Sequence, residues 1–211
     1  MVDEEQILEF DADQVVLATG AKWRRDGTGR WHDEPIPGWD VPSVVTPDDI
    51  MGGLMPTGLV VVYDDDHYYM GGVLAETLRK TGLDVTLVTP ANEVSTWTNN
   101  TEEQYRIQQR ILSLGIELVT GTSLASVSHD SVTLESIHTG QTREVEAATV
   151  VMTTSREPQD ALYHSMVDRI KIERIGDCLA PGTIATSVYS GHSFAREMDA
   201  EVSAGVPFLR E

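Results

Sequence analysis

The sequence of 211 residues has one cysteine, few basic residues and no long apolar run. Its single thiol, Cys178, cannot form an internal disulfide and cannot alone hold a zinc ion or an iron–sulfur cluster. No segment approaches the roughly 18 consecutive apolar residues that a membrane-spanning helix needs. The first ten residues, MVDEEQILEF, are acidic, whereas a signal or transit peptide would be basic. These absences predict a soluble, cytoplasmic chain without a metal.

Basic residues are scarce: 15 Lys and Arg stand against 34 Asp and Glu, which gives a formal net charge of −19. A surface this acidic repels phosphate backbones and anionic lipid headgroups, so we expect neither a nucleic acid nor a membrane as partner. The apolar fraction of 40% is enough for a packed core and excludes wholesale disorder. The excess of acid is typical of solubility or of a salt-rich habitat; an acidic docking face for a basic partner is the alternative.

The middle of the chain alternates short β-branched runs with helical patterns. Over residues 57–153 the expected order is β-α-β-α-β, then a three-stranded meander, then a final strand. Strands joined by helices must be parallel, and right-handed crossovers place the helices on the faces of the sheet. The predicted fold class is therefore α/β: a Rossmann-like parallel sheet of the FAD/NAD(P)-binding, glutathione-reductase-like type with a meander, plus part of a second nucleotide-binding domain.

Capping residues and glycines set the expected ends of three helices. Thr46 and Asp49 have the spacing of a capping box around Pro47, and Thr101 is expected to cap a helix in the same way. Gly82 follows a helical pattern and is expected to end it in the left-handed conformation.

Two further strands, in residues 14–20 and 171–177, have no βαβ partner of their own. We interpret them as two returning pieces of a second sheet whose first half is absent. The expected domains are a first segment of a partial FAD/ADP-type domain in residues 1–56, an NAD(P)-like Rossmann domain in residues 57–153, and the carboxyl-terminal segment of the FAD/ADP-type domain in residues 154–211.

The turn after the strand at residues 59–63 lacks the glycines of a dinucleotide fingerprint. Asp64, Asp66 and Tyr69 stand where a GxGxxG motif would place glycine. Carboxylates oppose a dianionic pyrophosphate and their Cβ atoms fill the space that glycine leaves open, so NAD(P) is not expected to bind. A divalent cation on residues 64–67 is the alternative, but consecutive residues rarely converge on one ion, and no metal site is predicted.

Three segments together carry a resemblance to a known family. They are VVLATGAKW (15–23) with PIPGWD (35–40), LVVVYDDDHYYMGGVLAETLRKTGLDVTLVTP (59–90), and RIGDCLAPGTIATSVYSGHSFARE (174–197). Nearly the whole chain from about residue 13 resembles the C-terminal part of flavin-dependent amine dehydrogenases and N-demethylases, such as trimethylamine, dimethylamine and histamine dehydrogenase and dimethylglycine or stachydrine demethylase-like proteins. In that family an N-terminal barrel carries FMN and a four-cysteine iron–sulfur cluster, and the sequence contains neither the barrel nor those cysteines.

The resemblance implies a cofactor site at two strand ends. In the resembled flavoproteins a strand-end Gly-Asp pair binds the flavin ribityl chain, and Gly176-Asp177 stands at that position. Thr19-Gly20 is the matching turn of the same domain. The implied ligand is FAD or ADP, bound weakly or not at all because the first glycine-rich turn is absent. The alternative is that Asp177 only caps or turns the chain.

The implied activity belongs to a longer parent protein. It is oxidative N-demethylation or amine dehydrogenation, with the flavin barrel of the same chain as partner and an electron-transfer protein as acceptor. The isolated chain is expected to be non-catalytic, because the sequence holds none of the catalytic residues. Two alternatives are a stand-alone degenerate Rossmann domain that acts as a docking module and a complete small NAD(P)H reductase; the missing glycines argue against the reductase.

Overall fold

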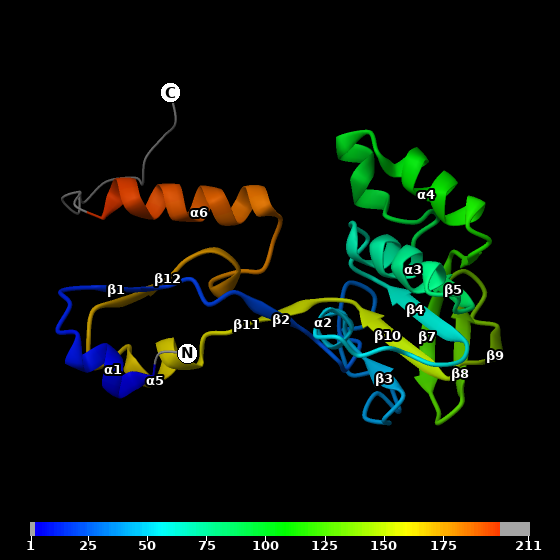
Figure 1. Ribbon diagram of the computed structural model, residues 1–211, viewed down its shortest axis with the longest axis horizontal. Coiled ribbons are helices and arrows are strands. Elements are labelled where there is room, and N and C mark those ends of the chain that lie inside the picture. Colours follow the sequence, from blue (N-terminus) through cyan, green and yellow to red (C-terminus); the bar gives the residue numbers. More distant parts are fainter. Residues whose placement is uncertain (1–2, 199–211) are drawn as a thin grey trace. The chain divides into compact units, whose positions relative to one another are not determined.

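A computed structural model gives the structure of residues 3–198 (Figure 1). Contacts between residues divide the chain into two compact units, unit 1 from residues 1–22 and 157–211 and unit 2 from residues 23–156. Within residues 3–198 no helix is both long and apolar enough to cross a membrane.

Unit 2 is built on a five-stranded sheet in which each neighbouring pair is parallel. The order across the sheet is β3 (Val44–Val45), β10 (Thr149–Thr153), β4 (Val60–Asp64), β5 (Val85–Val88) and β6 (Glu117–Val119). The β-branched runs predicted as strands form the buried centre of this sheet, since β4, β5 and β10 are buried at every residue. The predicted Rossmann-like α/β fold is confirmed.

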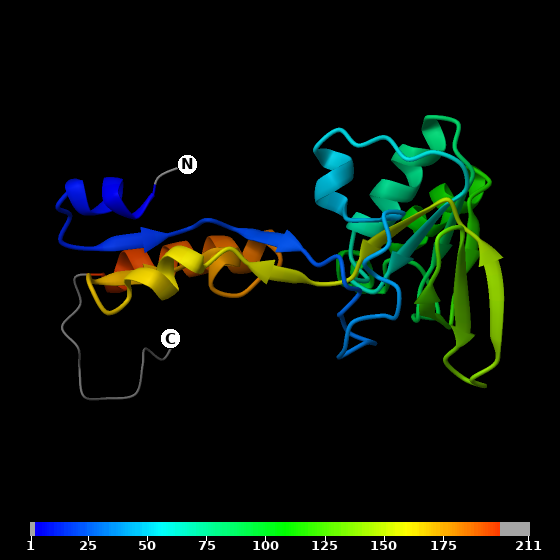
Figure 2. The same ribbon diagram turned by 90° about the horizontal axis from the view of Figure 1, so that it is seen from below.

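The two faces of this sheet are covered by different layers (Figures 1 and 2). Val60 and Val62 of β4 pack in a core with α3 (Met70–Lys80) and α4 (Gln104–Ser113). Val61 and Tyr63 point to the opposite face, because side chains alternate along a strand. There they pack against the antiparallel meander of β7 (Thr122–Val127), β8 (Ser131–Ser136) and β9 (Thr142–Glu146).

Two of the three predicted helix ends are confirmed. Helix α2 (Pro47–Met51) begins with the capping box of Thr46 and Asp49, and Gly82 follows α3 with a φ of 95°. The prediction that Thr101 caps the next helix is wrong. Residues Thr96–Thr101 form a 3-10 helix, η1, and α4 begins only after Glu103, without a side-chain cap.

Unit 1 contains a parallel pair of strands, β1 (Val15–Leu17) and β12 (Ile172–Arg174). Helices α1 (Glu4–Glu9) and α5 (Ala161–Met166), which the sequence did not reveal, contribute Ile7 and Met166 to a small core beside these strands. After the short 3-10 helix η2 (Gly176–Cys178), α6 (Ile184–Glu197) follows with no buried residue.

The boundaries of the compact units differ from the expected domain boundaries. They fall within β2 (Ala21–Trp23) and β11 (Arg156–Pro158), which pair with each other. Residues 23–56 belong to unit 2 because β3 pairs with β10 at the edge of the five-stranded sheet. The division into domains at residues 56 and 153 stays a prediction about folding.

Candidate functional site

The turn after β4 is the place where a Rossmann-like sheet receives a pyrophosphate. Asp64, the last residue of β4, and Asp65 are both fully buried. Oδ1 of Asp64 accepts the backbone N–H of His67 at 3.1 Å. Oδ2 of Asp64 is buried without a hydrogen-bond partner among the described residues. A carboxyl group with an unsatisfied oxygen thus occupies the first of the three positions at which a GxGxxG fingerprint has glycine.

The buried acids of this turn have raised pKa values. Burial raises the pKa of Asp64 to about 7 and that of Asp65 to about 6, and burial also raises the pKa of Asp66. Burial lowers the pKa of His67 to about 4. His67 Nε2 lies 3.4 Å from Asp65 Oδ1, a contact that would raise the pKa of the imidazole if it were an ion pair. Because the loss of hydration outweighs that contact, His67 is neutral at pH 7, and residues 64–67 supply no cation for a diphosphate.

Gly71 lets α3 approach the end of β4 very closely. A Cβ atom at Gly71 would lie 2.4 Å from Cγ and 2.5 Å from Oδ2 of Asp64. The third glycine of a dinucleotide fingerprint serves the same close helix–strand packing. Gly71, the second residue of α3, thus serves this packing two positions after the place that Tyr69 takes in the motif. Asp64 and Asp66 stand at the first two glycine positions of the motif.

The structure brings the two predicted cofactor segments together. Leu17 of β1 lies opposite Arg174 of β12, and both strands run in the same direction. Beyond them, the Thr19 hydroxyl contacts Sγ of Cys178 at 3.1 Å. Gly20 and Gly176 have φ angles of 76° and 61°, in the left-handed region that glycine adopts readily. Both turns therefore stand at the carboxyl ends of neighbouring parallel strands, where ligands of such sheets bind.

Asp177 holds the chain between η2 and α6. Its Oδ1 accepts the backbone N–H of Gly182 at 3.1 Å and the Ser187 hydroxyl at 2.8 Å. The Gly176 N–H donates to Ser190 Oγ at 3.0 Å. The carboxylate thus stabilises the start of α6, in agreement with the alternative that Asp177 caps or turns the chain. A role of Thr19, Gly20, Gly176 and Asp177 in binding a cofactor stays a prediction.

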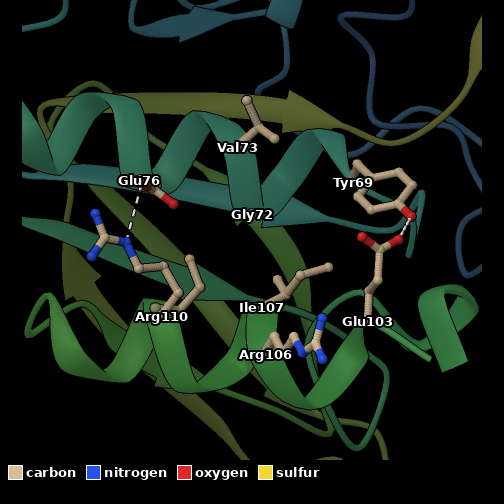
Figure 3. Close-up of a pocket in the computed structure, with 9 residues that line it drawn as sticks. Tyr69, Gly72, Val73, Glu76, Glu103, Arg106, Ile107 and Arg110 are labelled. Atoms are coloured by element: carbon tan, nitrogen blue, oxygen red, sulfur yellow. Dashed lines mark hydrogen bonds and ion pairs between the residues drawn. The ribbon is translucent and has the colours of Figure 1, made fainter. Parts of the chain in front are cut away.

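A groove with a volume of about 200 Å³ runs between α3 and α4 (Figure 3). Gly72 and Ile107 lie in its middle. At one end the Tyr69 hydroxyl donates to Glu103, and at the other Nε of Arg110 donates to Glu76 at 3.1 Å. Because the carboxylates at both ends already have partners, we assign the groove no ligand.

Comparison with known proteins supplies the family. The model of the pyridine nucleotide-disulphide oxidoreductase family matches residues 69–189, more than half of the chain. The chain belongs to this family.

Individual relatives confirm the resemblance drawn from the sequence. The chain is 39% identical to histamine dehydrogenase from Rhizobium sp. 4-9, with a TM-score of 0.92. This match covers 100% of the present chain and 34% of the dehydrogenase. It is 43% identical to 6-hydroxypseudooxynicotine amine oxidase from Pseudomonas geniculata N1, with a TM-score of 0.88, over 92% of this chain and 30% of that one. Dimethylamine dehydrogenase of Hyphomicrobium sp. (strain x) is 32% identical over 98% of this chain and 32% of its own length. The chain thus spans about a third of each of these relatives.

The family name implies a pyridine nucleotide, and the residues after β4 do not fit its diphosphate. A phosphate there would face the buried carboxyl groups of Asp64 and Asp65 instead of glycine amides. With a pKa of about 7, Asp64 is an anion in about half of the molecules at pH 7, and in that form its unpartnered oxygen is an acceptor, as phosphate oxygens are, so the two cannot hydrogen-bond. We therefore assign this turn no role in binding NAD(P).

The sequence did not reveal that residues 28–31 bind the turn after β4. The backbone N–H groups of Arg30 and Trp31 donate to Oδ2 of Asp65 at 2.6 and 2.8 Å. These donors precede their acceptor by about 35 residues. The donating groups are backbone amides, so the residue type does not indicate them. The one available signal was Gly29, since glycine, without a Cβ atom, permits a close approach of the backbone to another group.

Proposed function

We propose that this chain is the nucleotide-binding-like portion of a flavin-dependent oxidoreductase that oxidises or demethylates methylated amines. The observation that carries the proposal is the match to histamine dehydrogenase over the full chain, at 39% identity, together with the coverage of only 34% of that enzyme. A dimethylamine dehydrogenase aligns in the same way. On this proposal the amine site, FMN and the iron–sulfur cluster belong to the rest of a longer protein, and a separate electron-transfer protein is the electron acceptor.

The contribution of this chain is then to bind and orient a nucleotide in unit 1. FAD or ADP would lie across the adjacent turns Thr19-Gly20 and Gly176-Asp177, where glycine permits a close approach of the ligand to the backbone. Asp177 would accept hydrogen bonds from ribose or ribityl hydroxyls, in exchange for or in addition to those from Gly182 and Ser187. No residue of the chain is assigned a step in amine oxidation.

A docking module without enzymatic function is the rival proposal. The observation in its favour is the pair of buried carboxyl groups at the pyrophosphate turn of unit 2. The two proposals differ in what precedes the chain in its reading frame. Several hundred upstream residues with a four-cysteine cluster would support the first, and their absence would support the second.

The nucleotide site is tested by substitution of Asp177. In NMR titrations with ADP and FAD, we expect shifts at residues 19–20 and 176–177, with millimolar affinity because phosphate-binding glycine amides are lacking. A hydrogen bond to a charged acceptor is worth about 1.5–3 kcal/mol, so D177N should weaken ADP binding about tenfold. The exposed Asp168 provides the control, since D168N makes the same change of charge in the same unit and should not alter binding. Shifts confined to residues 64–69 would show that the site is assigned to the wrong turn.

The absence of catalysis in the isolated chain is tested directly. The purified chain should not reduce a dye in the presence of dimethylamine, trimethylamine or histamine, and it should carry neither stoichiometric FMN nor iron. The physical reason is that one cysteine cannot ligate a cluster and that no barrel is present for FMN. A yellow flavin spectrum with amine-dependent dye reduction would contradict the proposal.

A further inference from the structure

The order of the five-stranded sheet defines a switch point between β4 and β10. From β4 the sheet extends through β5 and β6 on one side, and through β10 and β3 on the other. In open parallel sheets of this kind, ligands bind outside the carboxyl ends of the strands at the point where the order reverses. The backbone N–H of Asp65 donates to the carbonyl of Thr153 at 2.9 Å, which joins the two strand ends at this point.

The chain's own residues 28–31 lie against both strand ends. A Cβ atom at Gly29 would stand 2.4 Å from Oδ2 of Asp65, after β4, and 3.1 Å from Cβ of Thr154, after β10. The Ser155 hydroxyl donates to the carbonyl of Thr28 at 2.6 Å. Only a glycine permits this approach, so the backbone of the segment takes the place that a ligand would need.

The backbone of this segment binds the Asp65 carboxylate in the way that proteins bind a free anion. Its Oδ2 accepts hydrogen bonds from two successive backbone amides, those of Arg30 at 2.6 Å and Trp31 at 2.8 Å. Successive amides that converge on one oxygen form the nests by which proteins bind phosphate. Here the anion is a side chain of the strand-end turn and the amides belong to the covering segment. Asp65 has no exposed surface, so water does not compete for these bonds.

Arg30 closes the outer side of the segment. Its Nε donates to the carbonyl of Asp66 at 3.3 Å, and its guanidinium lies 5.0 Å from the centre of the Trp97 ring. The positive charge of Arg30 also lowers the pKa values of Asp65 and Asp66 against the effect of burial. The cation that could meet a ligand's phosphate is therefore engaged with the acids of the turn.

We infer that residues 28–31 are a built-in occupant of the switch point, clamped by Asp65, and that they exclude dinucleotides from unit 2 by filling the site. The two amides of Arg30 and Trp31 and the carboxylate of Asp65 form inside the chain the contact that a Rossmann-like fold otherwise makes with phosphate. This inference concerns unit 2 alone and holds whether or not a longer protein oxidises amines.

The test measures hydrogen exchange at the amides of Arg30 and Trp31. Asp65→Ala removes the acceptor, and exchange of both amides, corrected for intrinsic rates, should become at least tenfold faster. Asp65→Asn keeps one acceptor oxygen and should give a smaller increase, which also serves if the alanine variant does not fold. Asp33→Asn is the control, since the exposed Asp33 follows the same segment and loses the same charge. Its exchange rates should match those of the wild type.

A second measurement adds NADH and inorganic pyrophosphate to the unaltered chain. Neither should shift the resonances of residues 28–31 or 64–72, because their place is filled. Two results would overturn the inference. One is unchanged exchange at Arg30 and Trp31 in both Asp65 variants. The other is micromolar binding of NADH to the wild type with accelerated exchange at these two amides.

Discussion

Replacing Gly71 by alanine should destabilise unit 2 by about 3 kcal/mol, near the upper end of the cost of inserting an atom into a packed core. The added Cβ would lie 2.4 Å from Cγ of Asp64, whose side chain is fully buried and cannot swing into solvent. Gly71 is itself buried within α3, so either the helix or the end of β4 must move. Denaturant unfolding followed by circular dichroism measures the effect.

The neighbouring glycine is a matched control for this substitution. A Cβ at Gly72 would stand 3.3 Å from Cγ2 of Ile107 and 3.4 Å from Oγ of Ser95, a crowding that small side-chain shifts relieve. Both substitutions add one methyl group to the same helix, where alanine is favoured over glycine by about 1 kcal/mol. The free energy of unfolding of Gly72→Ala should therefore lie within about 1 kcal/mol of the wild-type value. Equal stabilities of the two variants would show that α3 does not approach β4 as described.

The raised pKa of Asp64 should by itself lower the stability of unit 2 as the pH rises from about 4 to 7. The raised pKa values of Asp65 and Asp66 act in the same direction, and the lowered pKa of His67 acts in the opposite one. The native pKa of Asp64 is about 7, against an ordinary value of 3.8, so between these values the native state binds more protons than the unfolded state. The free energy of unfolding then decreases with pH in this window and levels off above it. At about 1.4 kcal/mol for each pH unit, the difference corresponds to about 4 kcal/mol at most.

Asp64→Asn isolates this contribution. The amide does not ionise, so the unfolding free energy of the variant should fall less between pH 5 and pH 8 than that of the wild type, while Asp65 and Asp66 still contribute in both. The carbonyl of the amide still accepts the N–H of His67, and the cost of an amide N–H without an acceptor is the same at both pH values. Asp130→Asn, at an exposed site in the same unit, should leave the wild-type slope unchanged. If the wild type and Asp64→Asn changed equally in unfolding free energy between pH 5 and pH 8, the raised pKa of Asp64 would be wrong.

The fold of unit 2 could be predicted because its signals are local. The buried strand Val60–Asp64 is a continuous β-branched run, and α3 follows with helical spacing and a terminal Gly82. The Thr101 cap failed for a local reason too. Glu102 takes a φ of 60° at the end of η1, so the chain turns before α4 can begin.

The candidate site was predictable only in part. The composition of the turn predicts that Asp64 and Asp66 obstruct a pyrophosphate, and this stays a prediction. The order of motifs placed Thr19 beside the Gly176-Asp177 turn, and the Thr19 hydroxyl lies 3.1 Å from Sγ of Cys178. The covering segment was not predictable, because Arg30 and Trp31 act through backbone amides on a partner far along the chain. Contacts of that kind depend on the tertiary path and not on residue type.

The contact between Asp65 and the amides of Arg30 and Trp31 also bears on how unit 2 responds to its surroundings. A domain that binds a soluble nucleotide gains stability in proportion to the logarithm of the free ligand concentration. A carboxylate tethered within the chain has an effective concentration fixed by the covalent path, in the way that linked binding partners do. Unit 2 should therefore keep the same folding equilibrium whether the cell is rich or poor in nicotinamide nucleotides, and its abundance should not report on their supply.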